Sequence, residues 1–290
     1  MKNKFIHKKI NGNFLVVGTA NNCEKLLRKS ISNIKLSIGK VKKVHFLIIE
    51  SDSKDNTVNL LEELTKDFEN FRFISLGSQL KKYPVKSDRI AYARNIYVRE
   101  INENKIYKDI NYIVVADVDE INHYLNDKSF DSCWDRDDWD MCSANQVGPY
   151  YDMYALRHPE WMPYDYKIKY ENLKRQYPNY KKHLNDILYS KIKIISKDHQ
   201  WISVESSFGG LAIYKKDCFN LNKYIGINEN GEEVCEHVEF NLNLKKKGKN
   251  LFINPKLINS IFTEHTKPPS FWKILRRKLN FIKLIKQKIL

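Results

Sequence analysis

The order of apolar and polar positions predicts alternating strands and helices over the first 120 residues. Short apolar runs with the length and β-branched content of buried strands occupy residues 14–20, 44–49 and 71–76. Apolar residues at helical spacing occupy residues 24–36, 58–64 and 86–102. Strands that alternate with helices over short connections indicate a parallel sheet with right-handed crossovers. The pattern therefore predicts an α/β fold that begins with a Rossmann-like nucleotide-binding sheet.

A further apolar run at 112–116 leads directly into the acidic sequence Asp117-Val118-Asp119-Glu120. Asp117 and Asp119 are two residues apart, so an extended backbone directs both side chains to the same side. Carboxylates placed in this way repel each other unless a cation lies between them. Because open α/β sheets bind ligands at the carboxyl ends of their strands, we expect Asp117 and Asp119 to bind Mg²⁺ or Mn²⁺ together with phosphate oxygens. The alternative is a pair of solvated loop carboxylates.

The second expected strand ends at Glu50, followed by a polar turn. Glu50 is placed to accept a hydrogen bond from a nucleobase or a ribose hydroxyl, as an acidic residue does in dinucleotide-binding folds. Ser53 or Asp55 is suited to cap the helix that follows. The alternative is a turn of Asp, Ser and Asn residues with no further role.

After the acidic sequence, the chain becomes rich in aromatic residues. Tyrosines and tryptophans between 146 and 166 are interspersed with Asp152 and Arg157, a mixture that suits sugar binding but also suits an aromatic mini-core. The basic segment 166–197 is expected to be helical and peripheral. In the sequence 206–214, Gly209-Gly210 is followed by an apolar strand, and glycines there allow a close backbone approach to a ligand.

A late helix begins near Cys235, and a closing strand follows at 251–254. Helical spacing places Glu236 and Glu239 on one face of this helix, although the helix dipole favours carboxylates at a helix start in any case. His265 follows the last strand, and an isolated histidine is usually structural. It becomes a candidate ligand only if the fold returns it to Asp119.

Composition and charge narrow the classes of protein. The chain has 290 residues, 42% of them hydrophobic, which suits one large domain with an appendage or two small domains. A net charge of +15 favours anionic partners such as nucleotides, nucleic acids or acidic membrane surfaces. Five scattered cysteines without a Cys-x-x-Cys pair argue against a disulfide framework. With no recognisable signal peptide or membrane span, we expect a cytoplasmic protein.

The C-terminal segment 270–290 has the pattern of a basic amphipathic helix. Apolar residues share one arc at about 100° per residue, and Lys and Arg side chains lie across from it. Pro268 and Pro269 separate the segment from the preceding chain. We expect this helix to lie on the inner face of an anionic membrane, or alternatively to dock on the main domain. The expected organisation is a domain at 1–265 and a tail at 266–290.

The order of these motifs resembles that of glycosyltransferases with the GT-A fold, over residues 14–265. The matching sequences are IIESDSKDNT, the helix with ARN, VVADVDE, FGGLAIY and CEHVEF, followed by the late histidine. The resemblance implies a nucleotide contact at Glu50, metal binding at Asp117 and Asp119, a catalytic or acceptor-binding acid at Glu236 or Glu239, and a third metal ligand at His265. YYDMYALRH and FGGLAIYKKDC are most similar to fungal capsule mannosyltransferases, although Tyr154 stands where that family has Trp. Inverting members usually have Glu-Asp at the helix start, and this chain has Glu236-His237.

We therefore expect a metal-dependent glycosyltransferase that moves a sugar from a nucleotide-diphosphate donor to a glycan or lipid-linked acceptor, in surface polysaccharide or glycoconjugate synthesis. The residues expected to bind the nucleotide-sugar are Thr19, Glu50, Arg94, Asp117 and Asp119. Glu239, Glu236 and Asp152 are the candidate catalytic residues, and a retaining reaction needs no base among them. A nucleotidyltransferase acting on sugar phosphates is the alternative. Nucleic-acid binding is disfavoured, because the basic residues concentrate in 167–197 and in the tail.

Overall fold

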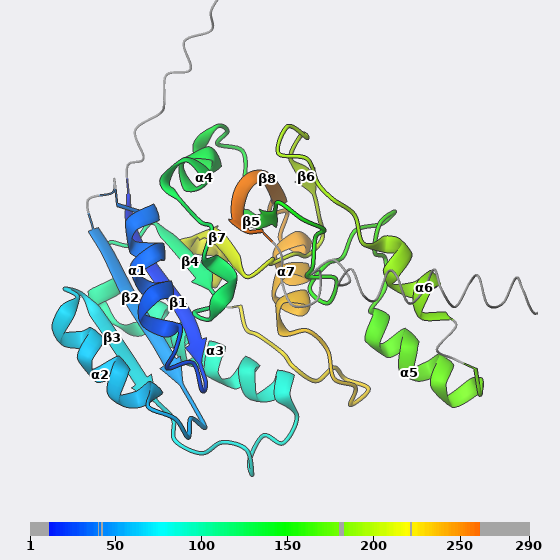
Figure 1. Cartoon of the computed structure of the whole chain (residues 1–290), viewed down its shortest axis with the longest axis horizontal. Coiled ribbons are helices and arrows are strands. Elements are labelled where there is room, and N and C mark those ends of the chain that lie inside the picture. The colour runs from blue at the N-terminus through cyan, green and yellow to red at the C-terminus, as the bar shows by residue number, and fades with distance from the viewer. Residues whose placement is uncertain (1–11, 40, 42, 180–182, 221, 262–290) are drawn as a thin grey trace, which may run out of the picture.

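A mixed eight-stranded sheet forms the centre of the computed structural model, which describes residues 12–39, 41, 43–179, 183–220 and 222–261 (Figure 1). The strand order is β3-β2-β1-β4-β7-β5-β8-β6. The strands are β1 (Asn13–Ala20), β2 (Lys43–Glu50), β3 (Phe71–Ser75), β4 (Tyr112–Ala116), β5 (Met141–Gln146), β6 (Ile202–Ser203), β7 (Leu211–Lys215) and β8 (Leu251–Ser260). The main helices are α1 (Leu27–Ser37), α2 (Thr57–Asp67), α3 (Lys86–Glu103), α4 (Asp127–Asp131), α5 (Tyr166–Gln176), α6 (Leu184–Ile187) and α7 (Glu236–Lys246).

The first half of the sheet is parallel, as the sequence predicts. β1 pairs in parallel with β2 and β4, and β2 pairs in parallel with β3. Because strand residues alternate between faces, Leu15 and Val17 pack in one core with α3, whereas Phe14 and Val16 pack in the other with α1 and α2. Both faces of the strands are buried, which explains why β1 and β4 are continuous apolar runs.

The second half of the sheet changes direction at β4. β7 pairs antiparallel with β4 and with β5, so the Gly209-Gly210 turn before β7 lies beside the acidic sequence that follows β4. β8 extends to Ser260, whereas the sequence predicts an end at Asn254. Pro255 lies inside this strand, although proline cannot donate a ladder hydrogen bond. The register between β5 and β8 shifts around Pro255, and the ladder resumes at Ile258.

The basic segment at 166–197 is less helical than expected. α5 ends at Gln176 because Pro178 disfavours helical geometry at the residue before it. α6 is a single turn, and short turns follow it. None of the residues of α5 is buried, which agrees with the predicted peripheral position (Figure 1).

Within the described residues, no helix is both long and apolar enough to cross a membrane. The five cysteines are all free in the structure. The predicted tail at 270–290 lies outside the described residues, and so does the predicted boundary at 265.

Candidate functional site

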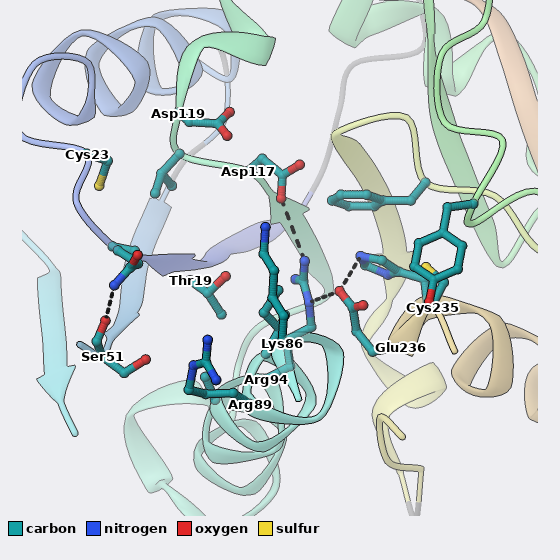
Figure 2. A pocket seen from close by; sticks show the side chains of 18 of the residues that line it. Thr19, Cys23, Ser51, Lys86, Arg89, Arg94, Asp117, Asp119, Cys235 and Glu236 are labelled. Carbon is teal, nitrogen blue, oxygen red and sulfur yellow. Dashed lines mark hydrogen bonds and ion pairs between the residues drawn. The ribbon is translucent and has the colours of Figure 1, made fainter. Parts of the chain in front are cut away.

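A cavity of about 500 Å³ opens at the carboxyl ends of β1 and β4. Its wall combines the end of β1, one face of α3, the turn after β4, the loop at 151–154 and the start of α7. Figure 2 shows Thr19 and Ser51 on one side, Asp117 and Arg94 near the middle, and Cys235 and Glu236 on the other side. Segments distant in the sequence therefore meet at the edge of the sheet where α/β folds bind ligands.

Asp117 and Asp119 both line this cavity, as their spacing predicts. The backbone N–H of Asp117 donates to the Gly210 carbonyl at 3.0 Å, and the Asn122 side chain donates to the Asp117 carbonyl at 2.8 Å. Asp119 accepts a hydrogen bond from the Ile121 N–H at 3.2 Å. These bonds hold the turn that presents the two carboxylates.

The charges of this pair fit a divalent cation. Burial, and next the negative charge of Asp119, raise the pKa of Asp117 well above its usual value. A cation between the two carboxylates would remove this repulsion, and carboxylate oxygens are the ligands that Mg²⁺ and Mn²⁺ prefer. No group of three His, Cys, Asp or Glu side chains in the described part of the chain is arranged to hold a metal. The predicted third ligand, His265, lies outside that part.

The backbone geometry and the close neighbours of the two glycines before β7 leave no room for a side chain at these positions. Gly209 and Gly210 have φ values of +69° and +81°, which residues with a side chain rarely adopt. A Cβ on Gly210 would lie 2.7 Å from the Ile121 side chain and 2.9 Å from the Tyr151 hydroxyl. We expected these glycines to admit a ligand, but the close approach is made by the chain itself.

Arg94 lies in the cavity wall between the acidic turn and α7. Its side chain is 3% exposed. Nε donates to Glu236 at 3.0 Å, one terminal nitrogen donates to the Tyr97 hydroxyl at 3.1 Å, and the other lies 3.6 Å from Asp117 (Figure 2). The sequence predicts that Arg94 holds the nucleotide. Its donors are instead directed to protein groups, so it joins the two acidic parts of the site.

The two acids at the start of α7 differ in position. Glu236 lines the cavity and is 8% exposed. Glu239 is not part of the cavity wall, and its carboxylate lies 3.8 Å from the Lys246 ammonium. On an α-helix, residue i+3 lies about 4.5 Å further along the axis than residue i and about 60° away from it around the axis. Glu239 therefore lies away from the opening. Of the two acids, Glu236 lines the cavity and Glu239 does not, and the catalytic role expected for Glu239 stays a prediction.

At the carboxyl ends of β1 and β2, one of the two predicted residues lines the cavity and the other does not. Thr19 lines the cavity, as expected, but Glu50 does not. Glu50 is 1% exposed, and its carboxylate accepts hydrogen bonds from the Ser53 N–H at 3.0 Å and from the Ser75 hydroxyl. Both oxygens of Glu50 are thus used inside the fold, and Ser51 is the cavity residue after β2.

The structure places Asp152 in the cavity wall and Arg157 outside it, although both were predicted from the aromatic segment. Asp152 lines the cavity and accepts hydrogen bonds from the Gly209 N–H at 2.9 Å and the Ala155 N–H at 3.2 Å. Arg157 lies outside the cavity wall and pairs with Asp165 at 2.5 Å. Asp165 in turn caps the N-terminus of α5. Arg157 therefore anchors the peripheral lobe, which α5 and α6 form, and it does not line the cavity.

Most of the cavity residues on α3 were not predicted. Lys86, Arg89, Ile90 and Ala93 line the wall together with the predicted Arg94, all from one face of the helix. Their spacing of i, i+3, i+4, i+7 and i+8 is that of a single helical face, and this signal could have identified them. Tyr151, Phe208, Cys235 and His237 also line the cavity. No regular spacing connects these four, because only the tertiary fold brings their segments together.

Comparison with solved structures identifies the fold. The chain is similar to the mannosyltransferase PcManGT from Pyrobaculum calidifontis, solved in complex with GDP-Man and Mn²⁺, with a TM-score of 0.51 and 12% identity. The similarity covers 92% of this chain and 60% of the length of PcManGT. The predicted GT-A fold is thereby confirmed.

Two further structures give lower scores. TarS from S. aureus has a TM-score of 0.44 and 11% identity, over 83% of this chain and 57% of TarS. Glucosyl-3-phosphoglycerate synthase from Mycobacterium tuberculosis, in complex with UDP, has a TM-score of 0.43 and 13% identity, over 89% of this chain and 74% of the synthase. No protein-family model and no curated protein sequence matches this chain.

Proposed function

We propose that this protein is a metal-dependent glycosyltransferase that uses a nucleotide-diphosphate sugar. The observation that carries the proposal is one cavity, on a GT-A fold, in which the carboxylates of Asp117 and Asp119 face a basic face of α3. A metal-bound diphosphate needs both kinds of group, because carboxylates hold the cation and cationic side chains contact the phosphates. The structural similarity to PcManGT, a mannosyltransferase in complex with GDP-Man and Mn²⁺, supports this reading.

The nucleotide would lie over the exits of β1 and β2. Thr19 and Ser51 line this side of the cavity, and their hydroxyl groups are suited to bind a ribose or a base edge (Figure 2). Lys86 and Arg89 would contact the diphosphate from α3. Asp117 and Asp119 would hold Mn²⁺ or Mg²⁺. When bound, the cation would neutralise the negative charge that grows on the leaving diphosphate.

The transferred sugar and the acceptor would lie toward α7. Asp152 and Glu236 line that part of the cavity, and Tyr151 adds a hydroxyl and an aromatic ring. Arg94 holds Glu236 in place through the hydrogen bond from Nε. We assign to Glu236 the role of acceptor-binding acid, and of general base if the reaction inverts the anomeric centre. A glycan or a lipid-linked sugar is the proposed acceptor.

We also propose that the protein associates with an anionic membrane through residues 270–290. The support is the amphipathic pattern of that segment, which joins a basic face to an apolar face. Peripheral attachment to the inner face of a membrane would bring the cavity near lipid-linked or surface-glycan acceptors. We propose further that the chain is related to fungal capsule mannosyltransferases and that it acts in polysaccharide synthesis.

The test is a donor screen with the full-length protein. A panel of GDP-, UDP-, CDP- and dTDP-sugars is incubated with Mn²⁺ or Mg²⁺, and release of the nucleotide is measured with and without EDTA. We expect one donor to give slow release that EDTA abolishes, and we expect Asp119→Asn to abolish it in the folded protein. Release that is insensitive to EDTA would contradict metal dependence. Turnover of a sugar 1-phosphate with a nucleoside triphosphate would identify a nucleotidyltransferase instead.

A further inference from the structure

His237, the second residue of α7, is a buried polar side chain without a hydrogen-bond partner. The residue is 2% exposed, and neither Nδ1 nor Nε2 has a hydrogen-bond partner within the described part of the chain. Buried polar side chains are nearly always hydrogen-bonded, because an unsatisfied group loses its hydration without compensation. A histidine left in this way therefore calls for a partner that is not part of the protein.

The rings around His237 fix its position but satisfy none of its polar atoms. The imidazole stacks on Phe208 with ring centroids 3.8 Å apart, and it meets the edge of Tyr224 at 5.6 Å. Nε2 lies 3.7 Å from the nearest carboxylate oxygen of Glu236, which is too long for a hydrogen bond. A phenylalanine would make the same apolar contacts without a desolvation cost, so packing alone does not account for this histidine.

His237 is held in its neutral form. Burial lowers the pKa of His237 well below its usual value, and the positive charge of Arg94 acts in the same direction. A neutral imidazole offers one N–H donor and one acceptor nitrogen. A hydroxyl group also donates and accepts, so it can satisfy this pattern, whereas an ionised phosphate only accepts.

His237 lines the same cavity as Asp117 and Asp119, next to Cys235 and Glu236. Both of its ring nitrogens are covered by protein atoms in this structure, so a sugar hydroxyl reaches them only when a neighbouring side chain shifts. Figure 2 places Cys235 and Glu236 on the side of Asp117 that lies away from Ser51. If the nucleotide lies near Ser51 and the diphosphate near Asp117, the region of His237 holds sugar rather than nucleotide.

We propose that the imidazole of His237 is a substrate-binding group that hydrogen-bonds a sugar hydroxyl in this cavity. The proposal rests on the proposed glycosyl transfer. The hydroxyl belongs either to the sugar of the donor or to the acceptor, and the chemistry of recognition is the same for both.

The test compares His237→Phe and His237→Gln with the wild-type chain. His237→Phe keeps the ring stacking and removes both polar atoms, whereas His237→Gln keeps a donor and an acceptor. Because His237→Phe removes an unsatisfied buried group, we expect its melting temperature to equal or exceed that of the wild type. A structural role for the imidazole predicts a lower melting temperature, so the sign of this change separates the two explanations.

Calorimetry then measures the binding of the donor selected by the screen, and of its parent nucleoside diphosphate, both with Mn²⁺. If His237 contacts the donor sugar, His237→Phe weakens binding of the nucleotide-sugar about fivefold to tenfold and leaves the nucleoside diphosphate unchanged. If it contacts the acceptor, both affinities stay unchanged and the KM for the acceptor rises by a similar factor. His237→Gln is expected to recover part of either loss.

Two results would overturn the proposal. One is a His237→Phe protein that binds the donor and uses the acceptor as the wild type does. The other is a destabilised His237→Phe protein whose folded fraction retains full activity. A wild-type chain that binds no nucleotide-sugar would instead refute the proposed function, so the two failures can be told apart.

Discussion

At the scale of single residues, the site depends on the buried guanidinium of Arg94. Arg94 hydrogen-bonds Glu236 and lies 3.6 Å from Asp117, and the rings of Phe208 and Tyr224 flank it at 5.4 and 5.6 Å. A planar guanidinium presents several donors in one fixed plane and a flat face that stacks on aromatic rings, whereas the ammonium group of a lysine is a compact point charge. Arg94 therefore keeps two acidic segments together that would otherwise repel each other.

We predict that Arg94→Gln destabilises the protein strongly. Removal of one partner from a buried ion pair leaves an uncompensated charge, which typically costs about 3–5 kcal/mol of the free energy of unfolding. Urea denaturation measures this loss. The matched control is Arg28→Gln, because Arg28 pairs with Glu63 and Asp67 at the exposed surface, where such pairs contribute little. Equal and small losses for the two variants would contradict the central role of Arg94.

The same scale explains which site residues the sequence could identify. Asp117 and Asp119 were predictable, because a buried strand and a two-residue spacing determine their direction. Glu50 and Arg157 lie outside the cavity wall, and each is bound to a protein partner that the sequence pattern does not reveal: Ser75 for Glu50 and Asp165 for Arg157. A side chain's residue type shows what it can bind, but its protein partners decide whether it remains available.

At the scale of elements, α3 provides a basic face to the cavity. The bounds of this helix were predicted to within one residue, because its apolar positions keep helical spacing over its whole length. Its role in the site was only partly predicted. Arg89 and Lys86 occupy the same face as Arg94, five and eight residues nearer the N-terminus, yet only the fold shows that this face borders the carboxylates.

We predict that Lys86→Ala and Arg89→Ala weaken the binding of a nucleoside diphosphate while the protein stays folded. Charge-assisted hydrogen bonds contribute about 1.5–3 kcal/mol each, so each change should raise the Kd by roughly tenfold or more. Calorimetry with GDP or UDP and Mn²⁺, at low and at moderate salt, measures the effect.

Arg99→Ala is the control for this pair, because Arg99 lies on the same helix but is exposed and outside the cavity wall. It should leave the Kd unchanged. An equal loss of affinity in all three variants would mean that net charge, and not the face of α3, determines binding.

At the scale of the whole molecule, the sequence identifies the parallel half of the sheet better than the second half. β1 to β4 follow one another along the chain with helices between them, so local periodicity is enough. The last four strands follow one another along the chain as β5, β6, β7 and β8 but lie in the sheet as β7, β5, β8 and β6, so their order depends on pairing between distant residues. The cavity lies where the two halves meet, which is why His237 escaped prediction.

The charge of the whole molecule leads to the last prediction. The segment 270–290 contains seven Lys or Arg residues and no Asp or Glu, and it alternates them with large apolar residues. We predict that the full-length protein co-sediments with vesicles containing phosphatidylserine and that a chain ending at residue 269 does not. Both electrostatic attraction and apolar burial contribute to interfacial binding, so neutral phosphatidylcholine vesicles should bind the full-length protein more weakly, and added salt should release it.

The peripheral lobe provides the competing explanation for membrane binding. α5 carries Lys167, Lys169, Lys174 and Arg175 and has no buried residue, so it is also a basic surface. A truncated chain that still binds anionic vesicles would assign the membrane contact to this lobe. A truncated chain that unfolds, judged by its melting temperature, would mean that the tail packs on the domain. Loss of vesicle binding with an unchanged melting temperature and unchanged nucleotide release assigns the contact to residues 270–290, because only the surface interaction has then been removed.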